Sequence, residues 1–386
     1  MCQPATSSKP RFLILDGLRG IAAIIVVIFH IFEAYAADPV QQIVNHGYLA
    51  VDFFFALSGF VIGYAYDDRW ARGMTFCNFV KRRLIRLHPM VIMGSLIGLL
   101  TFYFTASPSC PNVATTGIAA LLLLFVMCCL LIPSPDTFDL RGWGETYSLD
   151  GPMWTLMWEY MANLLYALFI RRLPIWMLAL LVLAAAVLTV DVALNINLFN
   201  LLTTDRMQIN TVIGGWSLTA EQLYIGTTRL LYPFFCGLLV YRLGRRIRLS
   251  GGFWWCAALV AAMLAMPRIG GYSAMWQNGL YEAICILLLF PLIVMTGAGS
   301  ATGVRTSAAC RWLGSISYPL YLSHYPLIYM LFAWNRTHAD LATPVHIFVG
   351  VSVFILSIAL ALAVTRLYDI PIRRWLTSRF ITTATR

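Results

Sequence analysis

Eleven hydrophobic segments constrain what this chain can fold into, because a transmembrane helix needs about 20 predominantly apolar residues. The segments are 12–36, 48–66, 89–106, 117–132, 151–170, 174–192, 224–243, 253–267, 277–296, 313–333 and 344–367. Of the 386 residues, 60% are hydrophobic and 11% are charged, against about 25% charged in soluble domains. We therefore expect an all-α, polytopic integral membrane bundle. It should form one membrane-embedded domain over 1–386, with no extra soluble domain.

Basic residues between these segments predict the orientation in the membrane. They lie at Lys81 to Arg86, Arg171 with Arg172, Arg242 to Arg248, Arg305 with Arg311, and in the tail at Arg373, Arg374 and Arg379. Such clusters stay on the cytoplasmic side, and they favour membrane loops over a nucleic-acid partner as the source of the +10 net charge. Eleven crossings would put several clusters outside. We expect 117–132 to be re-entrant or half-inserted, which leaves about ten transmembrane helices and both termini in the cytoplasm.

The polar segments 133–150 and 193–223 then face outside. Both carry Trp, Gly, Asp and Glu residues suited to a hydroxyl-rich ligand. The alternative is that they are plain connecting loops.

Ionisable residues inside the predicted spans are functional candidates, because a charge near the bilayer centre costs about 2.5–3.5 kcal/mol on insertion scales. Arg19 and His30 are eleven residues apart, which is close to three helical turns, so both face one side of the first span, roughly 16 Å apart. The alternative is that Asp16 holds Arg19 and that His30 packs as a neutral side chain.

Asp52 lies near the outer boundary of the second span, at a depth similar to that of His30. A carboxylate beside a histidine fixes its tautomer for general-base catalysis, so Asp52 is expected to orient His30. The alternative is that Asp52 caps the helix or pairs with a lysine or arginine. In the same span, Gly59 and Gly63 have a spacing that predicts close helix packing.

Further polar groups lie in the later spans. Glu159 is two turns into an apolar span that also carries Trp154 and Trp158, and His324 lies mid-span beside Ser323. Aromatic faces beside a carboxylate are suited to a sugar ring, so we expect these residues to bind a sugar substrate or to stabilise charge that develops during a reaction. An interfacial aromatic belt and a hydrogen-bonded core histidine are the alternatives.

Arg83 and Arg86 share one helix face in FVKRRLIRLHP, where such a pair can bind phosphate groups. Contact with anionic lipid headgroups is the alternative reading. The sequence has no P-loop, HExxH, CxxC pair or GxSxG, and no ligand cluster with metal spacing. We expect no metal and no permanently bound cofactor.

These motifs resemble the membrane acyltransferase-3 family, which includes bacterial enzymes that O-acetylate surface polysaccharides. The resemblance covers nearly the whole chain. It rests on LDGLRG at Leu15 to Gly20 with Arg19 and His30, AVDFFFALSGF with Asp52, RxxR at Arg83 and Arg86, the block with Trp154 and Glu159, and SYxxYLxH ending at His324. Ala50 replaces a glycine of the family pattern, and the glutamate block has one carboxylate where two are frequent.

The resemblance implies an acyl-CoA donor, often acetyl-CoA, taken from the cytoplasm, and an acceptor hydroxyl on a cell-surface, exported or lipid-linked glycan. It places the protein in the bacterial inner membrane. On this reading Arg83, Arg86 and Arg19 bind acyl-CoA, while His30 with Asp52, Arg19 and Glu159 carries out catalysis. Trp154, Trp158, His324 and Ser323 would contact the acceptor.

Two alternatives remain open at the level of the sequence. One is a transporter or flippase that uses the buried charges as a proton relay, although no inverted repeat is evident. The other is an acyltransferase that acts on a small hydrophobic metabolite.

Overall fold

The computed structural model describes residues 11–203 and 210–381, and within these ranges it contains helices and turns but no β-strand. The predicted outer segment 193–223 includes six residues outside the described ranges. The helices are α1 (Leu13–Tyr35), α2 (Ala50–Ala71), α3 (Phe76–Thr101), α4 (Ile118–Cys129), α5 (Met153–Leu168), α6 (Ile175–Leu194), α8 (Ala220–Leu243), α9 (Gly252–Ala265), α10 (Trp276–Ile284), α11 (Phe290–Gly299), α12 (Val304–Ser323), α13 (Tyr325–Thr337), α14 (Thr343–Val364) and α15 (Ile370–Phe380). The predicted all-α membrane bundle is confirmed.

Each of the eleven hydrophobic segments contains a helix. In the described part of the chain, seven helical stretches are long and apolar enough to cross a membrane. The count of ten spans stays a prediction. The segment predicted to be half-inserted forms α4, which has 12 residues and is therefore about 18 Å long, against about 30 Å of hydrocarbon in a bilayer. It is too short to cross alone.

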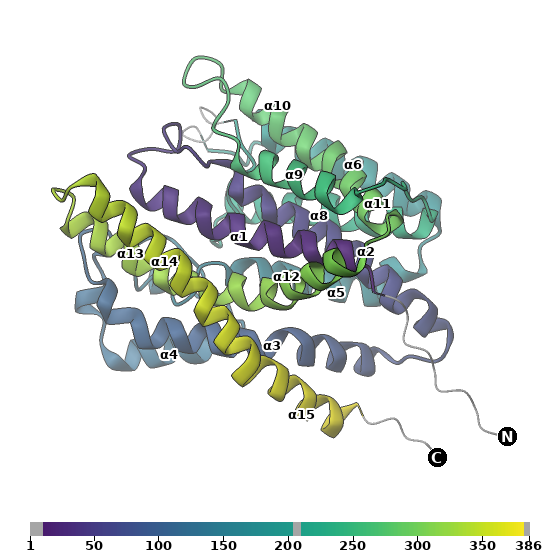
Figure 1. Ribbon diagram of the computed structural model, residues 1–386, viewed down its shortest axis with the longest axis horizontal. Coiled ribbons are helices and arrows are strands. Elements are labelled where there is room, and N and C mark those ends of the chain that lie inside the picture. The colour runs from purple at the N-terminus through teal and green to yellow at the C-terminus, as the bar shows by residue number, and fades with distance from the viewer. Residues whose placement is uncertain (1–10, 204–209, 382–386) are drawn as a thin grey trace.

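Two pairs of closely packed helices form the centre of the bundle. Helix α1 runs through the middle of the molecule (Figure 1) and packs most extensively against α12. A side chain at Gly20 would collide with the backbone of Leu313. Helices α2 and α8 form the second pair, in which Gly59 approaches the carbonyl group of Phe234 and Gly63 lies against Tyr241. The predicted role of Gly59 and Gly63 in close helix packing is confirmed.

All five predicted basic clusters gather at one end of the bundle, which we call the basic end. A large cavity there is lined by residues of the α3 cluster, by Arg311 and by the tail residues Arg373 and Arg374. The start of α1 and helix α15 lie toward this end (Figure 1). We call the opposite end, which holds the last turn of α1 and helix α13, the far end.

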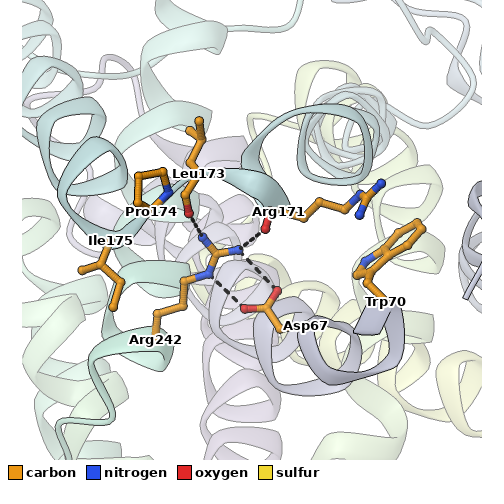
Figure 2. A pocket seen from close by; sticks show the side chains of 7 residues that line it. All are labelled: Asp67, Trp70, Arg171, Leu173, Pro174, Ile175 and Arg242. Atoms are coloured by element: carbon orange, nitrogen blue, oxygen red, sulfur yellow. Dashed lines mark hydrogen bonds and ion pairs between the residues drawn. The ribbon is translucent and has the colours of Figure 1, made fainter. Parts of the chain in front are cut away.

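An arginine clamp ties three helices together at the basic end (Figure 2). Arg242 of α8 donates to Asp67 of α2 over 2.9 Å and to the backbone carbonyl groups of Ile170, Leu173 and Arg171 just beyond α5. These carbonyl groups belong to the short turn Ile170–Arg172 and to Leu173 just after it, so the bonding anchors this turn to α8. The neighbouring Arg171 guanidinium lies 4.2 Å from the ring centre of Trp70. These contacts fix the turn between α5 and α6.

Helical geometry is interrupted at two places that matter for the site. Helices α12 and α13 meet at His324, where Pro326 removes a backbone donor from the first turn of α13. A single π-helical turn, Thr365–Asp369, joins α14 to α15. Such turns re-aim side chains and are frequent at functional sites. Both interruptions place polar side chains in the interior.

Candidate active site

A cavity of about 830 Å³ opens at the basic end between α1, α2, α3, α5, α12 and α15. Eight arginines and three acidic residues line it, so its charge is strongly positive. The arginines are Arg11, Arg19, Arg69, Arg83, Arg86, Arg311, Arg373 and Arg374. A cavity with this charge is suited to a ligand that carries several phosphate groups.

The two arginines of the RxxR motif have different environments within this cavity. The Arg83 side chain is 6% exposed and donates to Glu159 over 2.7 Å, while Ser58 donates to the same carboxylate oxygen over 3.1 Å. Arg86 is exposed to the cavity, and it has no hydrogen bond or ion pair to another described residue. Arg86 is therefore available to a ligand, whereas Arg83 is engaged with Glu159.

Arg19 also lines the cavity, one helix away from the RxxR pair. Its Nε donates to Ser317 of α12 over 3.0 Å, and Asp16 lies 3.4 Å from its Nη2. A carboxylate that sequence reasoning did not single out, Asp369, projects from the π-helical turn into the same cavity and pairs with Arg373 at 2.7 Å. The charged side chains of the cavity wall are thus held by hydrogen bonds and ion pairs to one another.

The cavity ends at a layer of three side chains contributed by α2, α5 and α12. Thr155 Oγ1 lies 3.1 Å from the hydroxyl group of Tyr321, and the rings of Phe54 and Tyr321 meet edge to face at 5.5 Å. On the other side of this layer, the imidazole of His324 lies 6.3 Å from the Tyr321 ring. The layer separates the arginine-lined cavity from a pair of histidines.

His30 and His324 form this pair, with ring centres 5.5 Å apart. His324 is fully buried, and its Nδ1 lies 2.9 Å from the carbonyl oxygen of Leu320. A carbonyl only accepts, so Nδ1 carries the proton and Nε2 is the basic nitrogen. Among the described residues His324 Nε2 has no partner, and the buried hydroxyl group of the adjacent Ser323 has none either. The structure therefore brings His30 and His324 together. Their positions in the chain did not predict this contact.

Glu33 is the carboxylate that contacts His30. Its Oε2 lies 2.7 Å from His30 Nδ1, one turn along α1. Since an ionised carboxylate only accepts, Nδ1 donates and Nε2 of His30 is left as the basic nitrogen. The side chains of His30 and Glu33 are 17% and 36% exposed, so the dyad is reachable from the far end. The spacing of three residues on one helix could have identified Glu33 from the sequence.

The predicted contact between Asp52 and His30 is wrong. Asp52 is fully buried and pairs with Arg229 of α8 at 2.7 Å. Arg229 also donates to the carbonyl groups of Gly214 and Tyr48. The physical reason is that a guanidinium buried in an apolar helix needs a counter-charge, and Asp52 supplies it. This is the alternative in which Asp52 pairs with an arginine, and the signal for it was Arg229, a charge in the interior of the apolar segment 224–243.

Trp154 and Trp158 occupy buried positions, with 8% and 3% exposure. The Trp154 ring lies 5.4 Å from the Arg229 guanidinium, and Trp158 Nε1 donates to the carbonyl group of Gly215 over 3.3 Å. Side chains at Gly215 and Gly226 would collide with these rings. In this structure the two indoles pack beneath the segment before α8 and do not line the histidine pair. Glu159 likewise lies with Arg83 in the cavity and not beside His30.

Comparison with known proteins agrees with this architecture. A family model described as an acyltransferase domain matches residues 12–365. Acyltransferase MdmB of Streptomyces mycarofaciens is 25% identical over 331 residues, which cover 81% of this chain and 78% of that protein. Protein 2 in the picA locus of Rhizobium radiobacter is 34% identical over 171 residues, 42% of this chain and 83% of the relative.

A third relative is the peptidoglycan O-acetyltransferase OatA of Listeria monocytogenes, which is 22% identical over 322 residues. The match covers 81% of this chain but about half, 49%, of OatA. No solved structure matches the chain at a significant level. The extent of the family match confirms the resemblance drawn from the motifs. The chain belongs to the acyltransferase-3 family of membrane acyltransferases.

Proposed function

We propose that this protein is an O-acyltransferase that takes an acyl group, most simply acetyl, from acyl-CoA on the cytoplasmic side. The acceptor is a hydroxyl group of a cell-surface or exported carbohydrate on the other side of the bacterial inner membrane. One observation carries the proposal. The arginine-lined cavity with its unengaged Arg86 ends against a layer that lies directly beneath His30 and His324.

The basic end fits the donor. Coenzyme A carries three phosphate groups, and Arg86 offers a guanidinium that makes no hydrogen bond or ion pair to a described residue. Under this proposal the basic end faces the cytoplasm, as arginine-rich loops favour. Arg19, deeper on α1, would accompany the pantetheine arm toward the layer of Phe54, Thr155 and Tyr321. Arg83 would contribute indirectly, because its ion pair fixes the position of Glu159 in the cavity wall.

The histidine pair fits the chemistry. Nε2 of His30, whose tautomer is set by Glu33, accepts the proton of the acceptor hydroxyl as its oxygen attacks the thioester carbonyl. A C–O bond forms, the C–S bond breaks, and the proton passes from His30 to the sulfur of the departing CoA. General-base assistance of this kind contributes about 10²–10⁴-fold. His324 would orient the acyl group or share the proton.

The acceptor approaches from the far end, where His30 and Glu33 are partly exposed. OatA of Listeria monocytogenes is named as a peptidoglycan O-acetyltransferase, which supports a carbohydrate acceptor for this chain too. Membrane lipids and the two substrates are the partners that the proposal requires.

A transfer assay with purified protein tests the proposal. Detergent-solubilised protein is incubated with radiolabelled acetyl-CoA and a crude membrane glycan fraction, and both label in the glycan and free CoA are measured. We expect label transfer that His30→Ala reduces by about 10²-fold or more. If the wild-type protein neither binds CoA nor turns it over with any acceptor fraction, the proposal fails and the transporter alternative takes its place.

A further inference from the structure

We propose that Glu145, on the segment between α4 and α5, binds a hydroxyl group of the acceptor sugar beside His30. This inference rests on the proposed function and extends it, because it assigns the acceptor site to a part of the chain that Trp154 and Trp158 do not reach.

The segment that carries Glu145 is built rigidly against the far end of the bundle. The fully buried Arg141 donates to the carbonyl group of Ser148 and to Thr105 Oγ1, both over 2.5 Å. Its guanidinium lies 3.7 Å from the ring centre of Tyr329 on α13. The backbone is held as well, because Ser134 N donates to the carbonyl group of Thr146 over 3.0 Å. A connecting loop without a role would not need a buried arginine at its centre.

Glu145 has one engaged oxygen and one available oxygen. The Tyr329 hydroxyl group donates to Oε2. Oε1 has no hydrogen bond to any described residue, and part of its surface is accessible. A side chain added at Gly151 would collide with Tyr325 and with Oε1 of Glu145 and would press on the Tyr329 hydroxyl group, so these three groups pack around Gly151. The carboxylate therefore converges with two tyrosines on one point and keeps an acceptor oxygen free.

A continuous run of aromatic rings connects this point to the proposed base. The ring centres of His30 and Tyr325 are 4.8 Å apart, and those of Tyr325 and Tyr329 are 4.6 Å apart. Trp143, two residues before Glu145, meets Tyr329 at 5.3 Å and is partly exposed. A ligand that rests against Trp143 and bonds to Glu145 would thus have other hydroxyl groups within a sugar's length of His30.

The ligand class follows from these groups. A carboxylate oxygen that accepts from a hydroxyl, next to partly exposed aromatic surface, is suited to a sugar ring, whose faces are apolar and whose edge carries hydroxyl groups. Four acidic residues, Glu145, Asp139, Glu33 and Asp150, lie around this point, and among the described residues Arg141 is the cation that acts on Glu145. Their charge favours a neutral or amino sugar over an acidic one.

The ionisation of Glu145 gives the site a distinctive pH dependence. Glu145 lies outside the predicted spans, and burial raises its pKa to about 7 against the opposing effects of Tyr329 and Arg141, while Asp139 and Glu33 raise it further. Below pH 7 the carboxyl is mostly protonated and neutral, and it accepts a hydroxyl proton more weakly. Acceptor binding should therefore strengthen as the pH rises through 7.

Titration of the acceptor tests the proposal. The probe is the carbohydrate fraction extracted from membranes of the cells that make the protein. It is titrated into full-length protein at a saturating concentration of radiolabelled acetyl-CoA. We expect Glu145→Ala to raise the half-saturating acceptor concentration about tenfold or more, as for a lost hydrogen bond to a charged group. Asp136→Ala, which removes an exposed charge from the same segment, is the matched control and should leave it unchanged.

Two further variants separate binding from a structural role. Glu145→Gln keeps the shape and an acceptor oxygen, so it should raise the half-saturating concentration less than Glu145→Ala does and abolish its change through pH 7. Tyr329→Phe removes only the hydrogen bond to Oε2. If Tyr329→Phe matches Glu145→Ala, or if Glu145→Ala leaves half-saturation unchanged, the inference is overturned. Absence of any transfer by the wild-type protein would instead overturn the proposed function itself.

Discussion

Glu33 holds His30 through a contact of 2.7 Å between its Oε2 and the imidazole Nδ1, one turn apart on α1. This contact sets which nitrogen of His30 is basic. It also puts the orienting carboxylate on the same helix as the base, so their relation does not depend on how the other helices pack.

Removing this carboxylate should reduce turnover without loss of the fold. We expect Glu33→Ala to lower kcat by about 10–10²-fold, less than His30→Ala, because the base remains but its tautomer is no longer fixed. The measurement is the initial rate of acetyl transfer, with acetyl-CoA binding as the control. A rate equal to that of the wild-type protein would show that Glu33 does not orient His30.

The two arginines of the RxxR motif should behave differently on substitution. Arg86→Ala should raise KM for acetyl-CoA about tenfold and leave Tm unchanged, since Arg86 has no described partner to lose. Arg83→Ala should lower Tm, because it leaves Glu159 without its cation. Equal effects of both substitutions on KM, with neither affecting Tm, would contradict this division of roles.

Substitutions in the buried pair of Asp52 and Arg229 should reduce the stability of the protein before they affect the chemistry. Both side chains are at most 2% exposed, so Asp52→Asn is expected to lower the free energy of unfolding by about 3 kcal/mol by leaving a buried guanidinium unpaired. The double variant Asp52→Leu with Arg229→Met should recover part of this loss. If Asp52→Asn abolishes transfer while thermal stability is untouched, Asp52 acts on the chemistry after all.

The layer between the cavity and the histidines should select the acyl chain. Phe54→Leu removes part of the aromatic surface that meets Tyr321 at 5.5 Å, which enlarges the passage. We expect the rate with butanoyl-CoA to rise several-fold relative to acetyl-CoA. An unchanged ratio in a variant that still transfers acetyl groups would show that the acyl group does not pass this layer.

Hydropathy predicts most of this fold because apolar runs of membrane-spanning length leave few alternatives to a helix. The bounds differ where a helix continues beyond the apolar run. Helix α3 begins at Phe76, not at 89, because the basic residues before the span are themselves helical. Helix α15 was not predicted at all, since its arginines interrupt the apolar pattern.

The site was predictable in its residue types but not in its pairings. One cavity is lined by Arg19, Arg83, Arg86 and Glu159. The depth of each residue in its span is enough to predict that they lie at the same level of the bundle. Which carboxylate meets which cation depends on helix rotation and packing. Asp52 and Arg229 are 177 residues apart in the chain, and nothing local in the sequence connects them.

The most direct test of the account is sidedness. Inverted and right-side-out vesicles that contain the wild-type protein or His30→Ala are given radiolabelled acetyl-CoA, which does not cross the membrane. We predict that label accumulates on glycan enclosed in inverted wild-type vesicles, and that right-side-out vesicles and His30→Ala give none. Label on glycan from either side, or transfer undiminished in His30→Ala, would contradict a donor that enters at the basic end and reacts at His30.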